Sequence, residues 1–318
     1  MTPLLASVIV VSWNSREFLP ACLDTVEAQT CREIETIVVD NGSTDGSADL
    51  VAERHPRAIL IRNHANEGFC RGNNIALKRS RGLHILCLNA DAILEPDFLE
   101  RALPAFEEDP AVGMVAGKVL RFDGITLDSA GQMLTRARRI LDRGYGEPDA
   151  GLYDQPAEVF SVCGAVALYR RTMIEEVSEA SEFFDESFVS FGEDMDVAWR
   201  ARRAGWRAAY VPSARARHYR GGTQPGGAGP LARLFQTARR PPEIRAHIIK
   251  NRWMTIIKND TARAFLRDLP FIAAWEICQG AYILFASPAT LAHLWRMRGA
   301  ISGAWRRRAG RPRPAAGE

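Results

Sequence analysis

Three acidic residues within four positions, Glu193, Asp194 and Asp196, are the densest group of candidate catalytic side chains in the sequence. A carboxylate in this group could act as the general base that takes a proton from an acceptor hydroxyl group. The alternative is helix capping, because acidic side chains in the first turn of a helix are stabilised by the helix dipole. On a helix, residues 193 and 196 are neighbours while residue 194 points elsewhere, so one acid can be structural and another catalytic.

A second polar group, Asn89-Ala90-Asp91, follows a strongly apolar segment. An acid at this point can hold Mg²⁺ or Mn²⁺ against a diphosphate, because these hard cations prefer oxygen ligands that they share with phosphates. Asp91 could equally be an ordinary helix cap. His218 is a candidate second ligand through a neutral imidazole nitrogen, and the alternative is a simple surface histidine.

Polar residues also follow three other apolar segments, with Asn14 after the first, Asp40 after the second and the segment 63–74 after the third. Asp40 is suited to accept hydrogen bonds from a nucleotide base or from ribose hydroxyl groups. A turn does not need an acid there, so we favour the ligand role. For Asp45 and Ser47 we favour turn formation and capping of the next helix.

The elements that must position these residues alternate between strands and helices. Apolar, β-branched runs predict buried parallel strands at Leu5–Val11, Ile34–Val39, Ala58–Ile61 and Leu83–Leu88. Helices are expected between them at Arg16–Gln29, Ser47–Arg54 and Gly72–Ser80. This alternation predicts a parallel sheet with right-handed crossovers, whose ligands bind beyond the carboxyl ends of the strands.

The later chain is less regular. We expect loops and a hairpin in 119–158, an apolar stretch at Val159–Tyr169, a helix from Arg171, a helix at Phe191–Ala204 and a strand at Trp206–Val211. The composition of Gly221–Gly229 indicates a loop or linker. Beyond it, 231–267 and 271–308 are expected to be basic, amphipathic helices.

The composition limits the class of protein. The 318 residues are 47% hydrophobic and 25% charged, which excludes a disordered chain. The net charge of +3 is unevenly divided, because residues 219–318 contain 17 basic and 5 acidic residues while residues 1–218 contain 24 and 33. The basic last third predicts contact with an anionic surface, either nucleic acid or lipid headgroups.

The cysteines and the apolar segments indicate the cellular compartment of the protein. Six scattered cysteines without a CxxC pair favour a reducing cytosol over a disulfide framework or a zinc site. The apolar N-terminus lacks the basic flank of a signal peptide. The longest uncharged stretch, Ile277–Trp295, contains Gln279, Pro288 and His293. These interruptions favour a helix pair in the membrane interface over a spanning helix, which needs about 20 predominantly apolar residues.

Seven motifs, in this order, resemble the family 2 glycosyltransferases, inverting enzymes of GT-A fold, and in particular their bacterial rhamnosyltransferase-like branch. They are SVIVVSWN (7–14), IVVDNGSTDGS (37–47), NEGFCRGNN (66–74), LNADAIL (88–94), CGAVALYRR (163–171), FFDESFVSFGEDMDVAWRARRAG (183–205) and the late His218. The resemblance runs from Ser7 to about Thr223.

The resemblance implies a donor site. Asp40 would contact the nucleotide base, and Asn14 and the segment 66–74 would complete the donor site. Within that segment the donor-binding residues are Asn66, Gly68 and Asn73.

The resemblance also implies a divalent metal, Mg²⁺ or Mn²⁺. Asp91 matches the metal-contacting acid of the family's DxD motif, and His218 matches a late metal-contacting histidine. Asn89 stands where the family has the first acid, and an amide is a weaker metal ligand than a carboxylate.

On the acceptor side, the resemblance matches Gly164 and Ala165 to small residues beside the acceptor, and Asp196 is expected on the same side. Asp194, paired with Glu193, would be the catalytic base. It would deprotonate an acceptor hydroxyl group that attacks the anomeric carbon of a nucleotide-sugar, dTDP-rhamnose or a UDP-sugar.

We therefore expect an α/β protein with a GT-A (Rossmann-like), mostly parallel central sheet flanked by helices. The expected domains are a catalytic domain over 1–222, a Gly-rich linker over 223–230 and a helical extension over 231–318. The expected partners are a nucleotide-sugar, a glycan or lipid-linked acceptor and an anionic membrane surface, with the protein cytoplasmic and peripheral on the inner face of the cell membrane. Two alternatives remain: a nucleic-acid-binding protein that uses the basic tail, although no such motif is recognisable, and a non-catalytic relative that only binds nucleotide-sugar.

Overall fold

The computed structural model describes residues 4–220 and 240–309, so the expected linker at 223–230 lies outside the described residues. The chain forms two compact units, and each is described by itself. The first comprises Met1–Met133 with Leu141–Pro230, and the second comprises Leu134–Ile140 with Leu231–Glu318.

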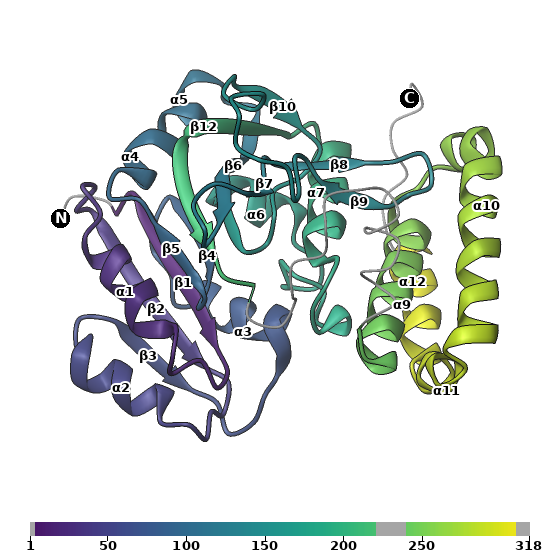
Figure 1. Cartoon of the computed structure of the whole chain (residues 1–318), viewed down its shortest axis with the longest axis horizontal. Helices are drawn as coiled ribbons and strands as arrows, with labels where there is room; N and C mark the ends of the chain where they lie inside the picture. The colour runs from purple at the N-terminus through teal and green to yellow at the C-terminus, as the bar shows by residue number, and fades with distance from the viewer. Residues whose placement is uncertain (1–3, 221–239, 310–318) are drawn as a thin grey trace. The chain divides into compact units, whose positions relative to one another are not determined.

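The first unit is built on a ten-stranded sheet with the order β10-β12-β6-β11-β4-β1-β2-β3, to which β5 is added beside β12 and β7 beside β6 (Figure 1). Strands β1 to β4 are parallel neighbours, β6 and β12 are also parallel, and β11 runs antiparallel between β4 and β6. The strands are β1 (Ala6–Ser12), β2 (Ile34–Asp40), β3 (Ile59–Arg62), β4 (His84–Asn89), β5 (Ala92–Leu94), β6 (Val112–Arg121), β7 (Leu127–Ser129), β10 (Ala157–Val159), β11 (Val166–Arg170) and β12 (Arg207–His218).

Helices connect these strands, and a short hairpin leaves the sheet after β7. The helices are α1 (Leu19–Glu27), α2 (Ser47–Arg54), α3 (Gly68–Leu77), α4 (Phe98–Ala102), α5 (Pro104–Glu108), α6 (Arg171–Val177), the 3₁₀ turn η1 (Glu186–Phe188) and α7 (Glu193–Arg203). The hairpin consists of β8 (Gln132–Leu134) and β9 (Ile140–Asp142).

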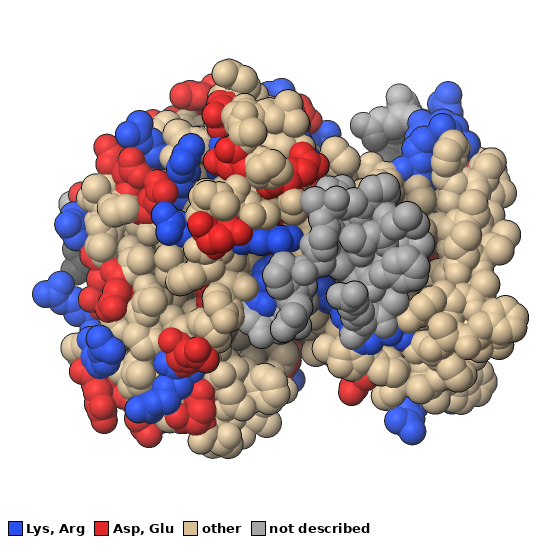
Figure 2. Space-filling view, viewed as in Figure 1, with Lys and Arg blue, Asp and Glu red and all other residues tan. Residues whose placement is uncertain are grey.

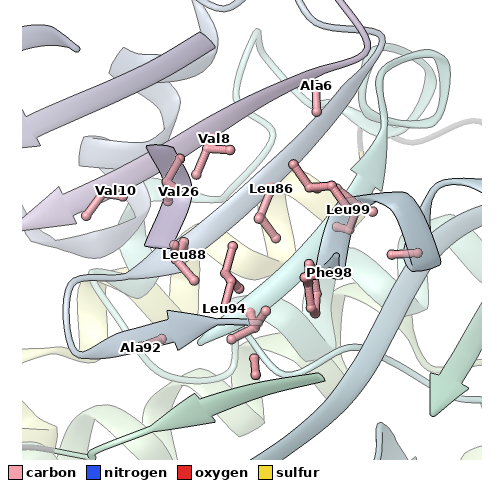
Figure 3. Packing of buried hydrophobic residues seen from close by; sticks show 14 of the residues in the cluster. Ala6, Val8, Val10, Val26, Leu86, Leu88, Ala92, Leu94, Phe98 and Leu99 are labelled. Carbon is pink, nitrogen blue, oxygen red and sulfur yellow. The ribbon is translucent and has the colours of Figure 1, made fainter. Parts of the chain in front are cut away.

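The core of this unit lies between the sheet and its helices. Strands β1 and β4 are apolar on both faces, and α1 buries Leu19, Cys22, Leu23 and Val26, which recur at the helical period. Figure 3 shows Val26 packed with residues of β1, β4, β5 and α4. Because both faces are covered, the polar ends of these strands are the places where ligands can reach the sheet.

The expected α/β fold with a mostly parallel sheet is confirmed, and the four expected parallel strands match β1 to β4 to within about one residue at each end. Two expectations need correction. The strand expected at Trp206–Val211 continues to His218. Residues 112–121 form the long strand β6, which was not predicted, and its last three residues lie in the segment where loops were expected. Gly117 and Gly113 weaken the strand pattern of β6 in sequence, and pairing with β11 and β12 compensates for that.

The described part of the second unit consists of the hairpin tip at 134–140 and α9 (Pro242–Asn259), α10 (Ala262–Ala286), α11 (Ala289–Arg296) and α12 (Arg298–Ala309). The sequence predicted a helix break near residue 270, and this is wrong. The break falls before α10, where the Thr261 side chain accepts a hydrogen bond from the Ala264 N–H at 3.1 Å, and Pro270 lies inside α10. The uncharged stretch 277–295 is interrupted at Ser287-Pro288, between α10 and α11.

Arginines of the hairpin tip bind the helices within the second unit. The Arg138 Nε donates to Asp260 Oδ2 at 2.7 Å, and its Nη1 donates to Asp268 Oδ2 at 2.8 Å. The guanidinium groups of Arg136 and Arg139 lie over the rings of Phe271 and Trp275, respectively, each 3.9 Å from the ring centroid. These basic side chains therefore help to pack the hairpin tip against the helices of the second unit.

One described helix, α10, is long and apolar enough to cross a membrane by length and composition alone. Only 11% of its apolar window is buried. Its outward residues Leu266, Ile277 and Leu284 lie on one face, because their spacings of 11 and 7 residues are close to whole turns. The buried Ile272 and Ile283 lie on another face.

Candidate functional site

The carboxyl ends of β1 and β2 lie side by side, with Ser12 opposite Asp40. Both residues are buried. The Asp40 Oδ2 accepts a hydrogen bond from the Ser43 N–H at 3.1 Å, whereas its Oδ1 and the Ser12 hydroxyl have no hydrogen-bond partner among residues 4–220 and 240–309. A buried carboxylate oxygen without a partner is costly, so a ligand that donates a hydrogen bond to it would stabilise this edge.

Asn14 joins the loops that follow these two strands. Its side-chain Oδ1 accepts a hydrogen bond from the Thr44 N–H at 2.9 Å, and its own N–H donates to the Ser43 hydroxyl at 2.9 Å. Its φ of 49° lies in the left-handed region, which asparagine tolerates better than most residues. Asn14 therefore shapes the same loop pair that carries Asp40.

The start of α3 adjoins this loop pair. The Asn66 Oδ1 accepts a hydrogen bond from the Gly68 N–H at 2.9 Å, and the Asn41 amide donates to the Gly68 carbonyl at 3.1 Å. Gly68 has a φ of 82°, and a Cβ there would lie 2.8 Å from the Val189 side chain, so only glycine fits. Asn73 is buried within α3, where it donates to the Phe69 carbonyl, while its Oδ1 has no hydrogen-bond partner among the described residues.

Asp91 and His218 come together because β5 pairs antiparallel with β12, with Ala92 opposite His218. The His218 Nε2 lies 3.1 Å from Asp91 Oδ1 and 3.4 Å from the Asn89 Nδ2. The other ring nitrogen, Nδ1, lies 2.9 Å from Asp128 Oδ2. Although burial opposes the charged ring, its hydrogen bonds to Asp128 and Asp91 raise the pKa of His218 to about 9.

The residues present fit a divalent cation only in part. Within residues 4–220 and 240–309, no group of three or more His, Cys, Asp or Glu side chains is arranged to hold a metal ion. Asp91 and His218 nevertheless offer one carboxylate oxygen and one imidazole nitrogen close together, a donor set that Mn²⁺ accepts. Cations that act on diphosphates commonly take one or two protein ligands and complete their shell with phosphate oxygens and water.

The acidic group begins α7 immediately after Gly192, whose φ is 81°. Both oxygens of the Asp194 carboxylate accept hydrogen bonds: Oδ1 from the Met195 N–H at 2.8 Å, and Oδ2 from the Gln132 amide at 3.0 Å and the Gly164 N–H at 3.4 Å. The neighbouring Glu193 is also buried, but its Oε2 has no hydrogen-bond partner in the part of the chain that the structure describes.

This difference in hydrogen bonding affects the pKa values of the two acids. Burial and the negative charge of Asp194 raise the pKa of Glu193 to about 8. Burial also raises the pKa of Asp194, but the hydrogen bonds from Gln132 and Met195 act in the opposite direction. The hydrogen bonds to Asp194 therefore favour its ionised form, and burial beside that carboxylate favours the protonated form of Glu193.

The expected acceptor-side residues have different surroundings. Ala165 accepts a hydrogen bond at its carbonyl from the Asn89 N–H at 2.9 Å, which ties the segment before β11 to the end of β4. A Cβ on Gly164 would lie 3.3 Å from Glu193 Oε1, so the small residue leaves room for the acid pair. Asp196 is buried and its carboxylate binds Arg200 at 3.0 Å, the contact of a residue that fixes α7.

Several residues that support this site could not be recognised from the sequence. Asp128, Gln132 and Asp142 lie in the segment predicted as loops and a hairpin, and Arg220 follows β12. Arg220 binds both Asp128 and Asp142, the latter at 3.2 Å. Nothing in their types or spacing distinguishes them from surface residues, because their role depends on contacts with residues far away in the chain.

The site can be compared with known proteins. A sequence profile described as Glycosyl transferase family 2 matches residues 7–178. A curated relative, the N-acetylglucosaminyl-diphospho-decaprenol L-rhamnosyltransferase of Mycobacterium tuberculosis (strain ATCC 25618 / H37Rv), is 27% identical over 242 residues, which cover 69% of this chain and 77% of the relative.

Solved structures share the fold. A mannosyltransferase from Pyrobaculum calidifontis in complex with GDP-Man and Mn²⁺ aligns with a TM-score of 0.55 at 22% identity, over 99% of this chain and 78% of that one. Residues 1–349 of TarS from S. aureus, in complex with UDP-GlcNAc, align with a TM-score of 0.61 at 17% identity, over 94% and 81%. The shared architecture is the GT-A fold, as the sequence predicted.

Proposed function

The chain belongs to glycosyl transferase family 2 and is a glycosyltransferase, and we propose that it carries out an inverting transfer of a sugar from dTDP-rhamnose or a UDP-sugar to a hydroxyl group of a lipid-linked or polysaccharide acceptor. The observation that carries the proposal is the pair of carboxylates at the start of α7. Asp194 accepts hydrogen bonds from three donors, which favour the ionised form that a general base requires. The resemblance to the mycobacterial rhamnosyltransferase favours a lipid-linked acceptor.

In the proposed reaction, Asp194 takes the proton of the acceptor hydroxyl group as its oxygen attacks the anomeric carbon. The bond from that carbon to the donor diphosphate breaks on the opposite side, so the anomeric configuration inverts. The backbone N–H of Met195 and the amide of Gln132 fix the direction of the Asp194 carboxylate. Such orientation matters because a proton is transferred only within hydrogen-bond reach of the base.

The donor would lie along the carboxyl ends of β1, β2 and β4. Asp40 would accept a hydrogen bond from the nucleotide base at its unpartnered Oδ1, while Asn14, Asn66 and Gly68 keep the surrounding loops in place. The close approach of Gly68 to Val189 links α3 to the segment that leads into α7.

Asp91 and His218 would hold Mg²⁺ or Mn²⁺ at the diphosphate, with Asn89 beside them. A bound cation of this kind neutralises charge that develops on the departing diphosphate. Within the protein, the ring of His218 is fixed from both sides, so its position does not depend on the donor.

A donor panel tests this proposal. The purified full-length protein is incubated with dTDP-rhamnose, UDP-GlcNAc, UDP-glucose and GDP-mannose, each with Mn²⁺ and with EDTA, and scored by thermal shift and by release of nucleoside diphosphate. We expect stabilisation and slow hydrolysis with dTDP-rhamnose or one UDP-sugar, both reduced by EDTA. A response to none of them would refute a nucleotide-sugar site here.

We also propose that the second unit contacts the cytoplasmic face of a membrane that carries the acceptor. Leu266, Ile277 and Leu284 form the outward apolar stripe of α10, and Ile277 is 71% exposed. In the view of Figure 2 the surface along α10 is mostly neither basic nor acidic. The last turn of α12 contains Arg306, Arg307 and Arg308. A unit that exposes both apolar and basic side chains has the composition that binds an anionic membrane interface.

A groove of about 610 Å³ on the same unit supports this orientation toward lipid. It is lined by Trp253, Leu291, Ala292, Leu294, Trp295, Arg298 and Ile301. Trp295 is largely exposed, and the Arg298 guanidinium lies over its ring at 4.5 Å. Tryptophan and arginine side chains are well suited to the boundary between headgroups and acyl chains.

Vesicle binding tests the membrane proposal with a matched pair of variants. Ile277→Glu places a charge on the stripe of α10, and Ile125→Glu places one at a residue of the first unit that is 69% exposed. We expect Ile277→Glu to reduce sedimentation with vesicles containing anionic lipid at least several-fold and Ile125→Glu to leave it unchanged. Equal effects of both variants, or no binding by the wild type, would refute the role of α10. Extraction of the wild-type protein by alkaline carbonate indicates an interfacial helix, and resistance indicates a spanning one.

A further inference from the structure

Asp128 is a buried acid that none of the recognised motifs contains. It lies in the middle of β7, which pairs with β6, and its side chain is inaccessible to solvent. Both oxygens are engaged: Oδ2 lies 2.9 Å from the His218 Nδ1, and Oδ1 accepts a hydrogen bond from the Arg220 Nε. A short strand between two loops does not need an acid at this point, so the contacts to His218 and Arg220 call for another explanation.

The two nitrogens of His218 face different groups. Nε2 lies 3.1 Å from Asp91 Oδ1, on the side of the donor site, while Nδ1 faces the interior at Asp128. An imidazole can bind a cation through Nε2 only if that nitrogen carries no proton, so the remaining proton must be on Nδ1. Asp128 is the acceptor that stabilises a proton there.

We propose that Asp128 is a positioning residue: when a divalent cation shared with Asp91 takes the place of the proton on the His218 Nε2, Asp128 holds the ring in the Nδ1–H tautomer and orients Nε2 toward the cation. The inference rests on the proposed donor site. Ligating histidines usually donate their second ring N–H to a carboxylate or carbonyl oxygen, and loss of that partner typically weakens metal binding by about 10–100-fold.

Arg220 completes the arrangement. It binds the second oxygen of Asp128 and also reaches Asp142 Oδ2 at 3.2 Å, so the buried carboxylate of Asp128 is compensated by a cation and cannot rotate away from His218. The order Asp142, Arg220, Asp128, His218, Asp91 alternates acidic and basic groups from the interior to the candidate metal site.

Arg220 also determines what an isosteric change would do. In Asp128→Asn, one end of the amide faces the Arg220 Nε–H, which only donates, so the amide oxygen must turn toward Arg220. The amide NH₂ then faces the His218 Nδ1 and donates to it. This arrangement favours the Nε2–H tautomer, which cannot bind a cation through Nε2. The substitution therefore reverses the tautomer without changing the size of the side chain.

The test measures binding of Mn²⁺, in the presence of dTDP or UDP, by electron paramagnetic resonance titration of wild type, Asp128→Asn, His218→Ala and the double variant. We expect the Kd for Mn²⁺ to rise about 10–100-fold in Asp128→Asn. We expect no further loss when Asp128→Asn is added to His218→Ala, because Asp128 acts through His218. The electron spin echo spectrum of wild type should contain a ¹⁴N coupling to Mn²⁺ that both single variants lose.

Asp123→Asn is the matched control, because Asp123 lies in the loop between β6 and β7 and its carboxylate accepts hydrogen bonds from the N–H groups of Ile125 and Thr126. It should bind Mn²⁺ as wild type does. Wild-type affinity in Asp128→Asn, or an equal loss in the His218→Ala background, would overturn the proposal while leaving the donor site intact. A wild-type protein that binds no Mn²⁺ with either nucleotide would overturn the metal site itself.

A second measurement covers the case in which Asp128→Asn does not fold. Long-range ¹H–¹⁵N correlation spectra of the wild-type protein with Mg²⁺ and dTDP or UDP report the tautomer of His218, assigned by comparison with His218→Ala. The Nδ1–H tautomer supports the proposal, and the Nε2–H tautomer refutes it.

Discussion

The acid pair at the start of α7 allows the catalytic base to be identified by two isosteric variants. Asp194→Asn removes the carboxylate that accepts hydrogen bonds from Met195, Gln132 and Gly164. Glu193→Gln replaces a neighbouring carboxyl group whose pKa is raised to about 8, so it is mainly protonated at pH 7. An amide is a close substitute for a protonated carboxyl group and a poor substitute for a general base.

The expected magnitudes differ accordingly. Loss of a general base typically lowers the rate by about 10²–10⁴-fold, which corresponds to about 2.7–5.4 kcal/mol of transition-state stabilisation. We expect Asp194→Asn to show a loss in this range in kcat. Glu193→Gln should lose at most about tenfold at pH 7, because the group that it replaces is already neutral there. Donor affinity should survive in both, since neither side chain belongs to the loops around Asp40.

The assay is steady-state transfer at saturating donor, with donor Kd measured separately by calorimetry. A loss of kcat at unchanged Kd in Asp194→Asn, together with a small effect of Glu193→Gln, supports the assignment. The reverse order of effects would refute the reasoning and make Glu193 the base. Near wild-type turnover in both variants would show that the base lies outside this pair. Asp196 is an unsuitable substitute because its carboxylate forms a buried ion pair with Arg200.

Three further outcomes are expected. Gly164→Ala should lower kcat by up to about 10²-fold without unfolding the protein, because the added Cβ would lie 3.3 Å from Glu193 Oε1 and displace the acid pair. Steady-state kinetics measures the loss of kcat, and circular dichroism shows whether the variant is folded. The pKa of Glu193 is raised above its ordinary value of 4.5, so the folded wild-type protein retains a proton that the unfolded chain loses. The free energy of unfolding of the wild type should therefore fall as the pH rises from about 4.5 to about 8. Glu193→Gln should flatten this part of a urea-unfolding pH profile. Arg138→Ala should lower the free energy of unfolding by about 3–5 kcal/mol in the same assay, since it leaves the buried Asp260 without its partner, whereas the exposed Arg263→Ala should change it by less than about 0.5 kcal/mol.

The sequence predicted the parallel half of the sheet well because its signals are local. Apolar runs such as Ile34–Val39 are too short and too β-branched for helices, and each is followed by polar residues at the sheet edge. The same argument places Asp40 and Asn89 at strand ends and Asp91 just beyond one, as the structure has them. Strand β6 was missed because its glycines weaken the strand pattern. The boundary between the two expected helical segments, 231–267 and 271–308, was misplaced: α10 continues through it and contains Pro270, although a proline usually ends a helix.

The supporting residues lay beyond sequence reasoning for a different reason. A residue that touches a substrate must have a particular chemistry, so Asp194 and His218 are conspicuous by type and position. A residue that supports another needs only a hydrogen-bonding group in the right place, which the fold determines. Gln132 acquires its role only when β8 lies beside α7, 62 residues later in the chain.

The segment 119–158 thus contributes more to the site than its irregular sequence indicates. Asp128 fixes the candidate metal ligand His218, Gln132 fixes the candidate base Asp194, and Asp142 holds the Arg220 that anchors Asp128. All three lie in or beside β7, β8 and β9, within fifteen residues of one another. Because one short stretch of chain orients both the metal side and the acceptor side, a change that shifts the base of this hairpin should impair donor binding and proton transfer together, whereas a substitution at Asp194 alone should affect only the latter.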